Sequence, residues 1–267
     1  MKFTFDHDLH IHSWISDCSQ DPEQTPERIL AYARENGLKT VCLTDHYWDA
    51  AVPGASDWYA FQNYEWINRA QPLPQAEGVE FRFGCETDMD RFMTVGISRE
   101  AFDLFDFVVI PTTHLHMRGF TISEEDASSL EGRVTTWLSR LDALLDMDLP
   151  FHKIGIAHLT CSLNVPEDRP GFLRMMDMLP EAELRRLFAK AAAVGVGIEL
   201  NSYDMKFADS EADTVLRIYR IAKQCGCKFY CGSDAHHPKG LDEAKAAFER
   251  AIDLLGLQES DKFHIGQ

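Results

Sequence analysis

The stretch Asp8-Leu9-His10-Ile11-His12 places two histidines at the end of a short apolar run, and this arrangement recurs along the chain. Four more short, mostly apolar runs end at a histidine, at residues 41–46, 108–114, 154–158 and 231–236. Runs of this length and composition are typical of buried β-strands. Because the carboxyl ends of parallel strands meet at one rim of a sheet or barrel, these histidines are expected to lie together.

Helical patterns alternate with these runs. Thr25 followed by Pro26 is typical of a helix start, and Asn36-Gly37 of a helix end. A strand predicted at 38–43 follows directly, and this β-α-β spacing favours a parallel sheet with a crossover helix. Further helices are predicted at 134–147, 181–193, 213–224 and 244–255, and further strands at 79–85, 105–113, 196–200 and 228–231. The alternation predicts one α/β domain over residues 1–267, with roughly seven strands.

The segment 47–75 interrupts this alternation and is rich in aromatic residues as far as residue 66. It fits two interpretations. One is an insertion that covers the rim of the sheet. The other, favoured by the abundance of aromatic residues in protein cores, is a loop and helix packed against the core.

The composition narrows the class of protein. Aspartate and glutamate outnumber lysine and arginine by 43 to 26, for a formal net charge of −17. This balance argues against binding of long nucleic acid, which requires clustered basic residues. No apolar run is long enough to span a membrane and no secretory signal is visible, so we expect a cytoplasmic protein. The seven cysteines are then expected to be reduced. The sequence carries no signal of oligomeric state.

Three cysteines, Cys225, Cys227 and Cys231, lie close together in the sequence. No fourth ligand lies near them, so they do not match a structural zinc site. Cys18 and Cys161 are close to predicted strand ends, and we expect both to be packed thiols without a chemical role.

The histidines and carboxylates at the strand ends have the spacing of metal ligands. Residues two apart on a strand point to the same side, so His10 and His12 can bind one ion. Asp234 and His236 repeat that spacing. Glu86, at the end of the run 79–85, would supply a carboxylate able to bridge two cations. Imidazole and carboxylate ligands together suit zinc, iron or manganese.

Further motifs surround these residues. The first are His10-X-His12-Ser13, Ser16-Asp17, Pro26-Glu27, Gly37-Leu38 and Thr44-Asp45-His46, and later ones are Gly84-X-Glu86, His114, Ala157-His158, Glu199-X-Asn201 and Gly232-Ser233-Asp234-Ala235-His236. In this order they resemble the PHP (polymerase and histidinol phosphatase) superfamily over residues 8–238. The resemblance implies a distorted (β/α)7 TIM-like barrel with up to three divalent metal ions at its C-terminal rim.

The resemblance also implies a ligand set. It assigns His10, His12, Glu86 and Asp234 to the first ion, Glu86, His114 and His158 to the second, and Asp17, His46 and His236 to the third. Glu86, Asp234 and His236 are the implied catalytic residues, because they hold the ions at which water would be activated. His116 competes with His114, which we prefer as the first polar ligand after its strand. Asp45, Glu199 and Asn201 are expected to orient the ligands.

Clustered dications lower the pKa of bound water and neutralise phosphate, so the expected activity is phosphoester hydrolysis without a side-chain nucleophile. Phosphate also needs cationic or hydrogen-bonding partners on rim loops, and the candidates are Arg118, Arg169, Lys206 and His237. We expect a small-molecule phosphate monoester as the substrate, with L-histidinol phosphate as the specific hypothesis because the chain most resembles stand-alone histidinol phosphatases.

Two alternatives stay open. One is a phosphodiesterase or exonuclease that acts on nucleotides or short oligonucleotides, with the aromatic segment 47–66 stacking on a nucleoside. The other is a non-catalytic PHP module that is stabilised by its metal site. The complete set of ligand residue types speaks against this second alternative.

Overall fold

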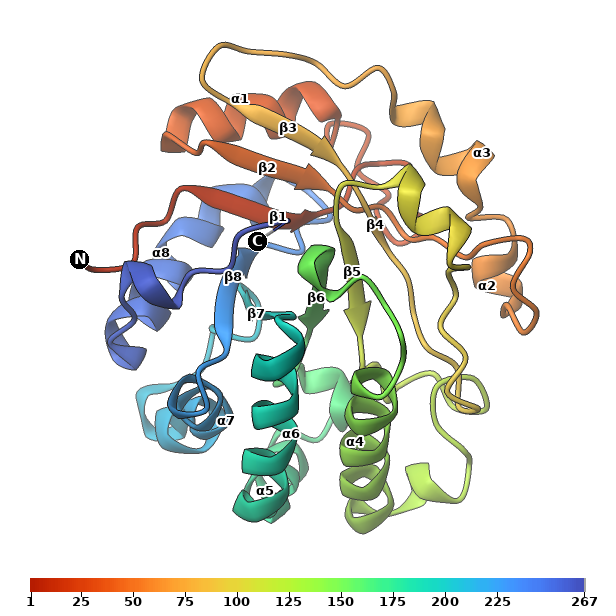
Figure 1. Cartoon of the computed structure of the whole chain (residues 1–267), viewed down its shortest axis with the longest axis vertical. Helices are drawn as coiled ribbons and strands as arrows, with labels where there is room; N and C mark the ends of the chain where they lie inside the picture. The colour runs from red at the N-terminus through yellow and green to blue at the C-terminus, as the bar shows by residue number, and fades with distance from the viewer. Residues whose placement is uncertain (267) are drawn as a thin grey trace.

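The computed structural model describes residues 1–266, which form parallel strands surrounded by helices (Figure 1). The strands are β1 (His7–Ile11), β2 (Thr40–Leu43), β3 (Glu80–Phe83), β4 (Cys85–Glu86), β5 (Val108–Pro111), β6 (Ile154–Ala157), β7 (Gly197–Asn201) and β8 (Lys228–Gly232). The α-helices are α1 (Pro26–Asn36), α2 (Asp57–Ala60), α3 (Tyr64–Ile67), α4 (Leu130–Leu145), α5 (Arg169–Met178), α6 (Glu181–Val194), α7 (Ala212–Gln224) and α8 (Pro238–Leu255). Short 3-10 helices lie at Asn68–Ala70, Glu100–Leu104, Asp126–Ser128, Phe151–Lys153, Ser162–Asn164, Asp209–Glu211 and Glu259–Asp261.

The strands form two parallel sheets, in the orders β1-β2-β3 and β4-β5-β6-β7-β8. The α/β class and parallel pairing predicted from the sequence are confirmed. The predicted barrel is not seen as one closed sheet among the described residues. Single parallel bridges nevertheless join the two sheets, between Ile11 and Ala235 and between His46 and Glu86.

The strand predicted at 79–85 is divided at Gly84 into β3 and β4. A Cβ atom at Gly84 would overlap the carbonyl oxygen of Phe107 and lie 2.8 Å from Cys42 Sγ. The chain therefore passes too close to its neighbours for any larger residue, and it changes sheets at this point. Counting β3 and β4 as one interrupted strand recovers the seven strands that the alternation predicts.

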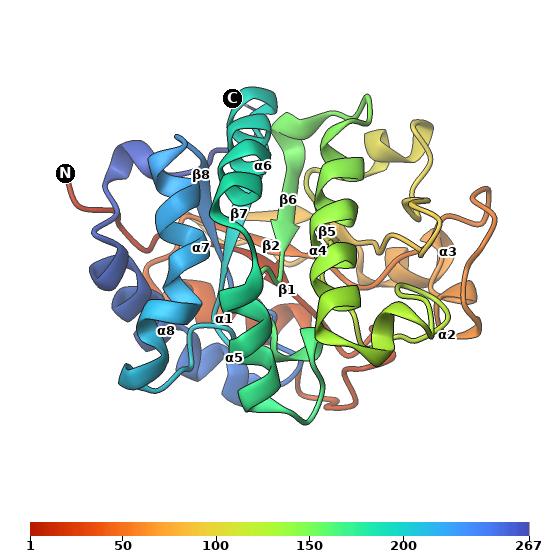
Figure 2. The same ribbon diagram turned by 90° about the horizontal axis from the view of Figure 1, so that it is seen from below.

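Helices α4, α5, α6 and α7 cover one side of the strands, and α1 and α8 lie near β1 and β2 (Figures 1 and 2). Helix α1 begins and ends as predicted: Thr25 accepts a hydrogen bond from the backbone N–H of Arg28, and Gly37 adopts a left-handed conformation. Helix α5 was absent from the sequence prediction, although Asp168 caps it and Pro170 occupies its first turn. None of the helices among residues 1–266 is long and apolar enough to cross a membrane.

The aromatic segment 47–75 contributes both to the core and to the rim. Trp48 and Tyr59 are fully buried, as the core interpretation expects. Trp58 and Tyr59 also line a cavity of about 700 Å³. The short helices α2 and α3 lie at one side of the molecule, away from α6 and α7 (Figure 1).

Candidate metal centre

Histidines and carboxylates gather where the strands end. Glu86 is the last residue of β4, and His12, His46, His114, His158, Asp234 and His236 each follow the carboxyl end of a strand. Three groups of these residues have ligand atoms within 4.8 Å of one another: His10, His12, Glu86 and Asp234; Glu86, His114 and His158; and His12, His46 and His236. The sequence-predicted clustering of these residues is thus present in the structure.

The first group has the spacing of a metal coordination sphere. His12 Nε2 lies 3.2 Å from Glu86 Oε2 and 3.1 Å from Asp234 Oδ1. His10 Nε2 lies 3.4 and 3.5 Å from the same two oxygens, and the two Nε2 atoms are 3.1 Å apart. Ligand atoms around a tetrahedral zinc ion lie about 3.3 Å apart, given metal–ligand bonds of about 2.0–2.1 Å. These four residues therefore fit one divalent ion.

Glu86 belongs to both the first and the second group. Its Oε2 atom lies 3.1 Å from His46 Nδ1 in addition to the first-group histidines. Its Oε1 atom is buried and has no hydrogen-bond partner, and His158 Nε2 lies 3.6 Å away. A buried carboxylate oxygen without a partner is costly unless a cation binds it. This oxygen fits a second ion, bridged to the first by Glu86.

The pKa values of the buried carboxylates and imidazoles in this cluster depend on one another. Burial alone would raise the pKa of Glu86, but His46 and His10 hold it well below its usual range. Burial alone would lower the pKa of His10, yet Glu199, Glu86 and Asp234 hold it well above its usual range. Burial lowers the pKa of His236 to about 4. Charged carboxylates and neutral imidazoles are the forms that bind divalent ions, and Glu86 and His236 are held in these forms.

His10 and His12 are each oriented by a contact at Nδ1, the ring nitrogen that faces away from the first ligand group. His10 Nδ1 lies 2.6 Å from Glu199 Oε1, and His12 Nδ1 lies 3.0 Å from Ser16 Oγ, which donates to Asp45. A proton on Nδ1 leaves the lone pair of Nε2 for a metal ion. Glu199 and Asp45 thus have the orienting contacts expected from the sequence.

A buried pair of charges orients His114. Its Nδ1 atom lies 2.9 Å from Asp88 Oδ2, and Arg140 Nη2 donates to Asp88 Oδ1 at 3.1 Å. Arg140 is fully buried and also donates to three backbone carbonyls. Neither residue was predicted, because Asp88 lies beyond the last residue of its strand motif, Glu86, and Arg140 lies within the predicted helix 134–147.

Two ligands have a backbone conformation that non-glycine residues rarely adopt. The φ angles of His158 and Asp234 are 63° and 54°, in the left-handed region. Gly232 lies close by, where a Cβ atom would overlap Glu199 Oε1 and come within 2.7 Å of the Cβ of His10. Strained positions of this kind persist where the surrounding structure holds them, which is common at functional sites.

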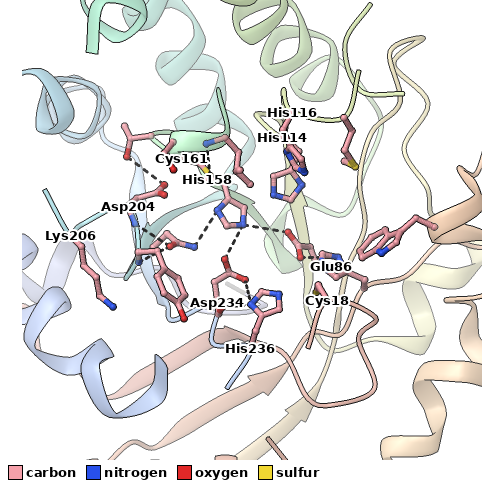
Figure 3. Close-up of a pocket in the computed structure, with 18 of the residues that line it drawn as sticks. Cys18, Glu86, His114, His116, His158, Cys161, Asp204, Lys206, Asp234 and His236 are labelled. Carbon is pink, nitrogen blue, oxygen red and sulfur yellow. Dashed lines mark hydrogen bonds and ion pairs between the residues drawn. The ribbon is translucent and has the colours of Figure 1, made fainter. Parts of the chain in front are cut away.

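The ligand groups open into one cavity of about 700 Å³. His46, Glu86, His114, His158, Asp234 and His236 line it together with Arg169 and Lys206. Figure 3 shows His158 between Glu86 and Asp204, with Asp234 and His236 below. A cavity of this size matches small-molecule sites, which typically measure about 300–1,000 Å³.

Several predicted residues lie outside this arrangement. Asp17 is exposed, belongs to none of the ligand groups, and its backbone N–H donates to Gln62 Oε1. Arg118 is exposed, pairs with Glu124 at 3.6 Å and does not line the cavity. His237 accepts a hydrogen bond from Gly240 and caps α8.

Other predicted residues do reach the cavity. His116 lines it, but His114 is the one grouped with Glu86 and His158. Arg169 lies in the first turn of α5 rather than in a loop, and it pairs with Glu211. Lys206 pairs with Glu243.

The cavity also contains residues for which the sequence predicted no role. Cys18 and Cys161 both line it. Asp204 lines it too, and burial raises the pKa of Asp204 to about 7. Among the described residues, Cys225, Cys227 and Cys231 do not appear in any of the groups that could hold a metal ion.

Comparisons with known proteins agree with this geometry. The family model described as PHP domain matches residues 8–203, more than half of the chain. A search of curated protein sequences finds no match. Among solved structures, the chain is similar to a histidinol phosphate phosphatase from Lactococcus lactis subsp. lactis Il1403, complexed with zinc, L-histidinol and phosphate. The two are 17% identical, the match covers 92% of this chain and 93% of the other, and the TM-score is 0.59. The chain belongs to the PHP family.

Proposed function

We propose that this protein is a metal-dependent phosphoesterase that hydrolyses small phosphate monoesters on a distorted (β/α)7 barrel. The observation that carries the proposal is the spacing of the first ligand group. Its nitrogen and carboxylate oxygen atoms lie 3.1–3.5 Å apart across His10, His12, Glu86 and Asp234. The similarity to a zinc-containing histidinol phosphate phosphatase supports the same activity.

The residues would divide among up to three ions. His10, His12, Glu86 and Asp234 would hold the first, and Glu86, His114 and His158 the second. For the third, His46 and His236 are grouped by the structure, whereas Asp17, which the resemblance assigns to the same ion, lies outside that group. Zinc, iron and manganese all suit this donor set. Divalent ions supply activation of water near neutral pH and neutralisation of phosphate charge.

The protein's own residues hold and position the substrate. Arg169 and Lys206 place positive charge at the wall of the cavity into which the ligand groups open. Glu211 accepts two hydrogen bonds from Arg169, which fix the plane of its guanidinium group. A fixed guanidinium can bind a phosphate through two parallel hydrogen bonds, whereas Lys206 offers a point charge.

The test is hydrolysis by protein that has been stripped with a chelator and reloaded with zinc, iron or manganese. The panel contains L-histidinol phosphate, simple alkyl phosphates, nucleoside monophosphates, a phosphodiester and short DNA. We expect monoester turnover that His12→Ala abolishes and that His152→Ala, a matched change at an exposed histidine outside the site, leaves intact. Full activity in reloaded His12→Ala would contradict the proposal.

One observation favours nucleotides as an alternative substrate class. The half-buried indole of Trp58 lines the cavity and packs edge-on against His46, with ring centroids 4.8 Å apart. An aromatic side chain at this place could stack on a base. Faster turnover of nucleotides or DNA than of alkyl phosphates would support that class. Turnover of none of the esters by metal-loaded protein would favour a non-catalytic module.

A further inference from the structure

The chain after β6 and after β7 brings an imidazole, a thiol and a carboxylate together in the wall of the cavity. Ligand atoms of His158, Cys161 and Asp204 lie within 4.8 Å of one another, and the three residues are 4%, 7% and 9% exposed. Ligand atoms around zinc lie about 3.3–3.6 Å apart, so movements of at most about 1.5 Å would bring these three to one ion. All three lie beyond the ends of the strands, where such movements disturb no sheet.

The sulfur and the carboxylate both have room for a cation. Cys161 Sγ accepts a hydrogen bond from the backbone N–H of Leu163 at 3.4 Å, and a donor at this place favours the thiolate form. Among residues 1–266, the one side-chain hydrogen bond to the Asp204 carboxylate comes from Thr160 Oγ1, at 3.5 Å. Each group is therefore held in place by the backbone around it while its remaining lone pairs stay available.

His158 presents its two ring nitrogens to different surroundings. Its Nε2 atom lies 3.6 Å from both Glu86 Oε1 and Asp234 Oδ2, on the side of the metal centre. Its Nδ1 atom lies 3.3 Å from the amide nitrogen of Asn201. The orientation of that amide is fixed, because its oxygen accepts from two backbone N–H groups at 2.9 and 3.4 Å. An amide nitrogen only donates, so this contact places the lone pair of His158 on Nδ1.

That lone pair is on the side of the thiol and the carboxylate. Figure 3 shows Cys161 and Asp204 on the side of His158 that faces away from Glu86. A neutral imidazole that binds an ion through Nδ1 carries its proton on Nε2. The proton blocks Nε2, so His158 can serve an ion at Cys161 and Asp204 or the second ion at Glu86, one at a time.

We propose that His158, Cys161 and Asp204 form an inhibitory zinc site, which withdraws His158 from the second ion when zinc is in excess. Thiolate, imidazole and carboxylate are all zinc ligands, and three of them leave the fourth position to water. A thiolate favours zinc, whereas manganese prefers oxygen ligands, so excess manganese should not inhibit. The inhibition rests on the proposed phosphoesterase function, but the binding of an ion at this place does not.

The first test detects the bound thiolate without any substrate. A thiolate bound to Co²⁺ gives a charge-transfer absorption in the near ultraviolet, which imidazole and carboxylate ligands do not give. Chelator-treated protein titrated with Co²⁺ should develop this absorption, and Cys161→Ser should lose it. Asp204→Asn should need about 10–100-fold more Co²⁺ to reach it, because loss of even an orienting partner weakens metal binding by that factor.

Cys18→Ser is the matched control. Cys18 lines the same cavity but belongs to none of the ligand groups, so the absorption should be unchanged in this variant. Absence of the absorption in wild type, or its survival in Cys161→Ser, would overturn the proposal.

The second test measures phosphate ester hydrolysis as zinc is added to chelator-treated protein. The wild-type rate should rise and then fall, and the zinc concentration for half-inhibition should increase by about 10–100-fold in Cys161→Ser but not in Cys18→Ser. Equal inhibition of wild type and Cys161→Ser, or equal inhibition by manganese, would overturn the inhibitory role. If no ester is hydrolysed at any zinc concentration, the phosphoesterase function and the inhibitory role both fail, and the Co²⁺ absorption still decides whether the site binds an ion.

Discussion

Replacing Asp88 with asparagine tests whether the buried charge pair holds the metal centre. Asp88 uses both oxygens, one for His114 and one for Arg140, whereas asparagine has one oxygen and would turn an N–H toward the other partner. Breaking a buried ion pair costs about 3–5 kcal/mol. Arg140 keeps three carbonyl partners, so we expect about 3 kcal/mol, or a fall in Tm of about 6–12 °C for a chain of this size.

The same change should weaken metal binding. Loss of a partner that orients a ligand histidine typically lowers affinity by about 10–100-fold. Urea unfolding of chelator-treated protein measures the stability change, and competition with a chromophoric chelator measures zinc affinity. Because His114 is assigned to only one of the groups, the weakening should affect one bound ion rather than all of them.

Asp90→Asn is the matched control. Asp90 is also buried, two residues away, but its Oδ1 atom accepts from the backbone N–H groups of Phe92 and Thr94, both at 2.8 Å. Asparagine keeps that oxygen, so the cost should stay under about 1 kcal/mol. If Asp88→Asn unfolds at the same urea concentration as Asp90→Asn and binds zinc equally well, the assignment of Asp88 as the support of His114 is refuted.

Three further changes test other parts of the structure. Although burial alone would raise the pKa of Asp6, His7 and Lys262 hold it below its usual range. The charged Asp6 therefore stabilises the folded protein above about pH 4, and this contribution is lost as the pH falls further. Between pH 7 and pH 3, the free energy of unfolding in urea should fall more for wild type than for Asp6→Asn. Gly232→Ala should cost about 1–3 kcal/mol in thermal unfolding, since its Cβ would overlap a buried carboxylate oxygen; an unchanged Tm would contradict that packing. Asp17→Asn should bind as many ions as wild type by elemental analysis, because Asp17 is exposed and outside the ligand groups; loss of one ion would restore it as a ligand.

The strand-end ligands could be predicted because apolar runs identify strands and parallel strands end at one rim. His114, His158 and Asp234 follow such runs directly, and the structure brings them together. Asp17 and Cys18 lie instead in a turn. The two-residue alternation of a strand does not apply there, so sequence alone could not show that Cys18 lines the cavity and Asp17 does not.

The loop residues were difficult to predict for the same reason. Arg118 and Lys206 both follow predicted ligand strands, but only Lys206 reaches the cavity. Nothing in the sequence distinguishes Asp204 from the other acidic residues in loops. Its burial depends on contacts with the loop after β6, including the hydroxyl of Thr160. Such contacts between distant loops leave no periodic signal in the sequence.

The first ligand group joins the two ends of the chain. His10 lies in the first strand and Asp234 follows the last one. The backbone N–H of Asp234 donates to the carbonyl of His10 at 2.7 Å. A growing chain therefore cannot complete this ligand group until residue 234 of 267, more than four fifths of the chain, has been made. The site of the proposed first ion therefore forms late in synthesis, when the last strand is in place beside the first.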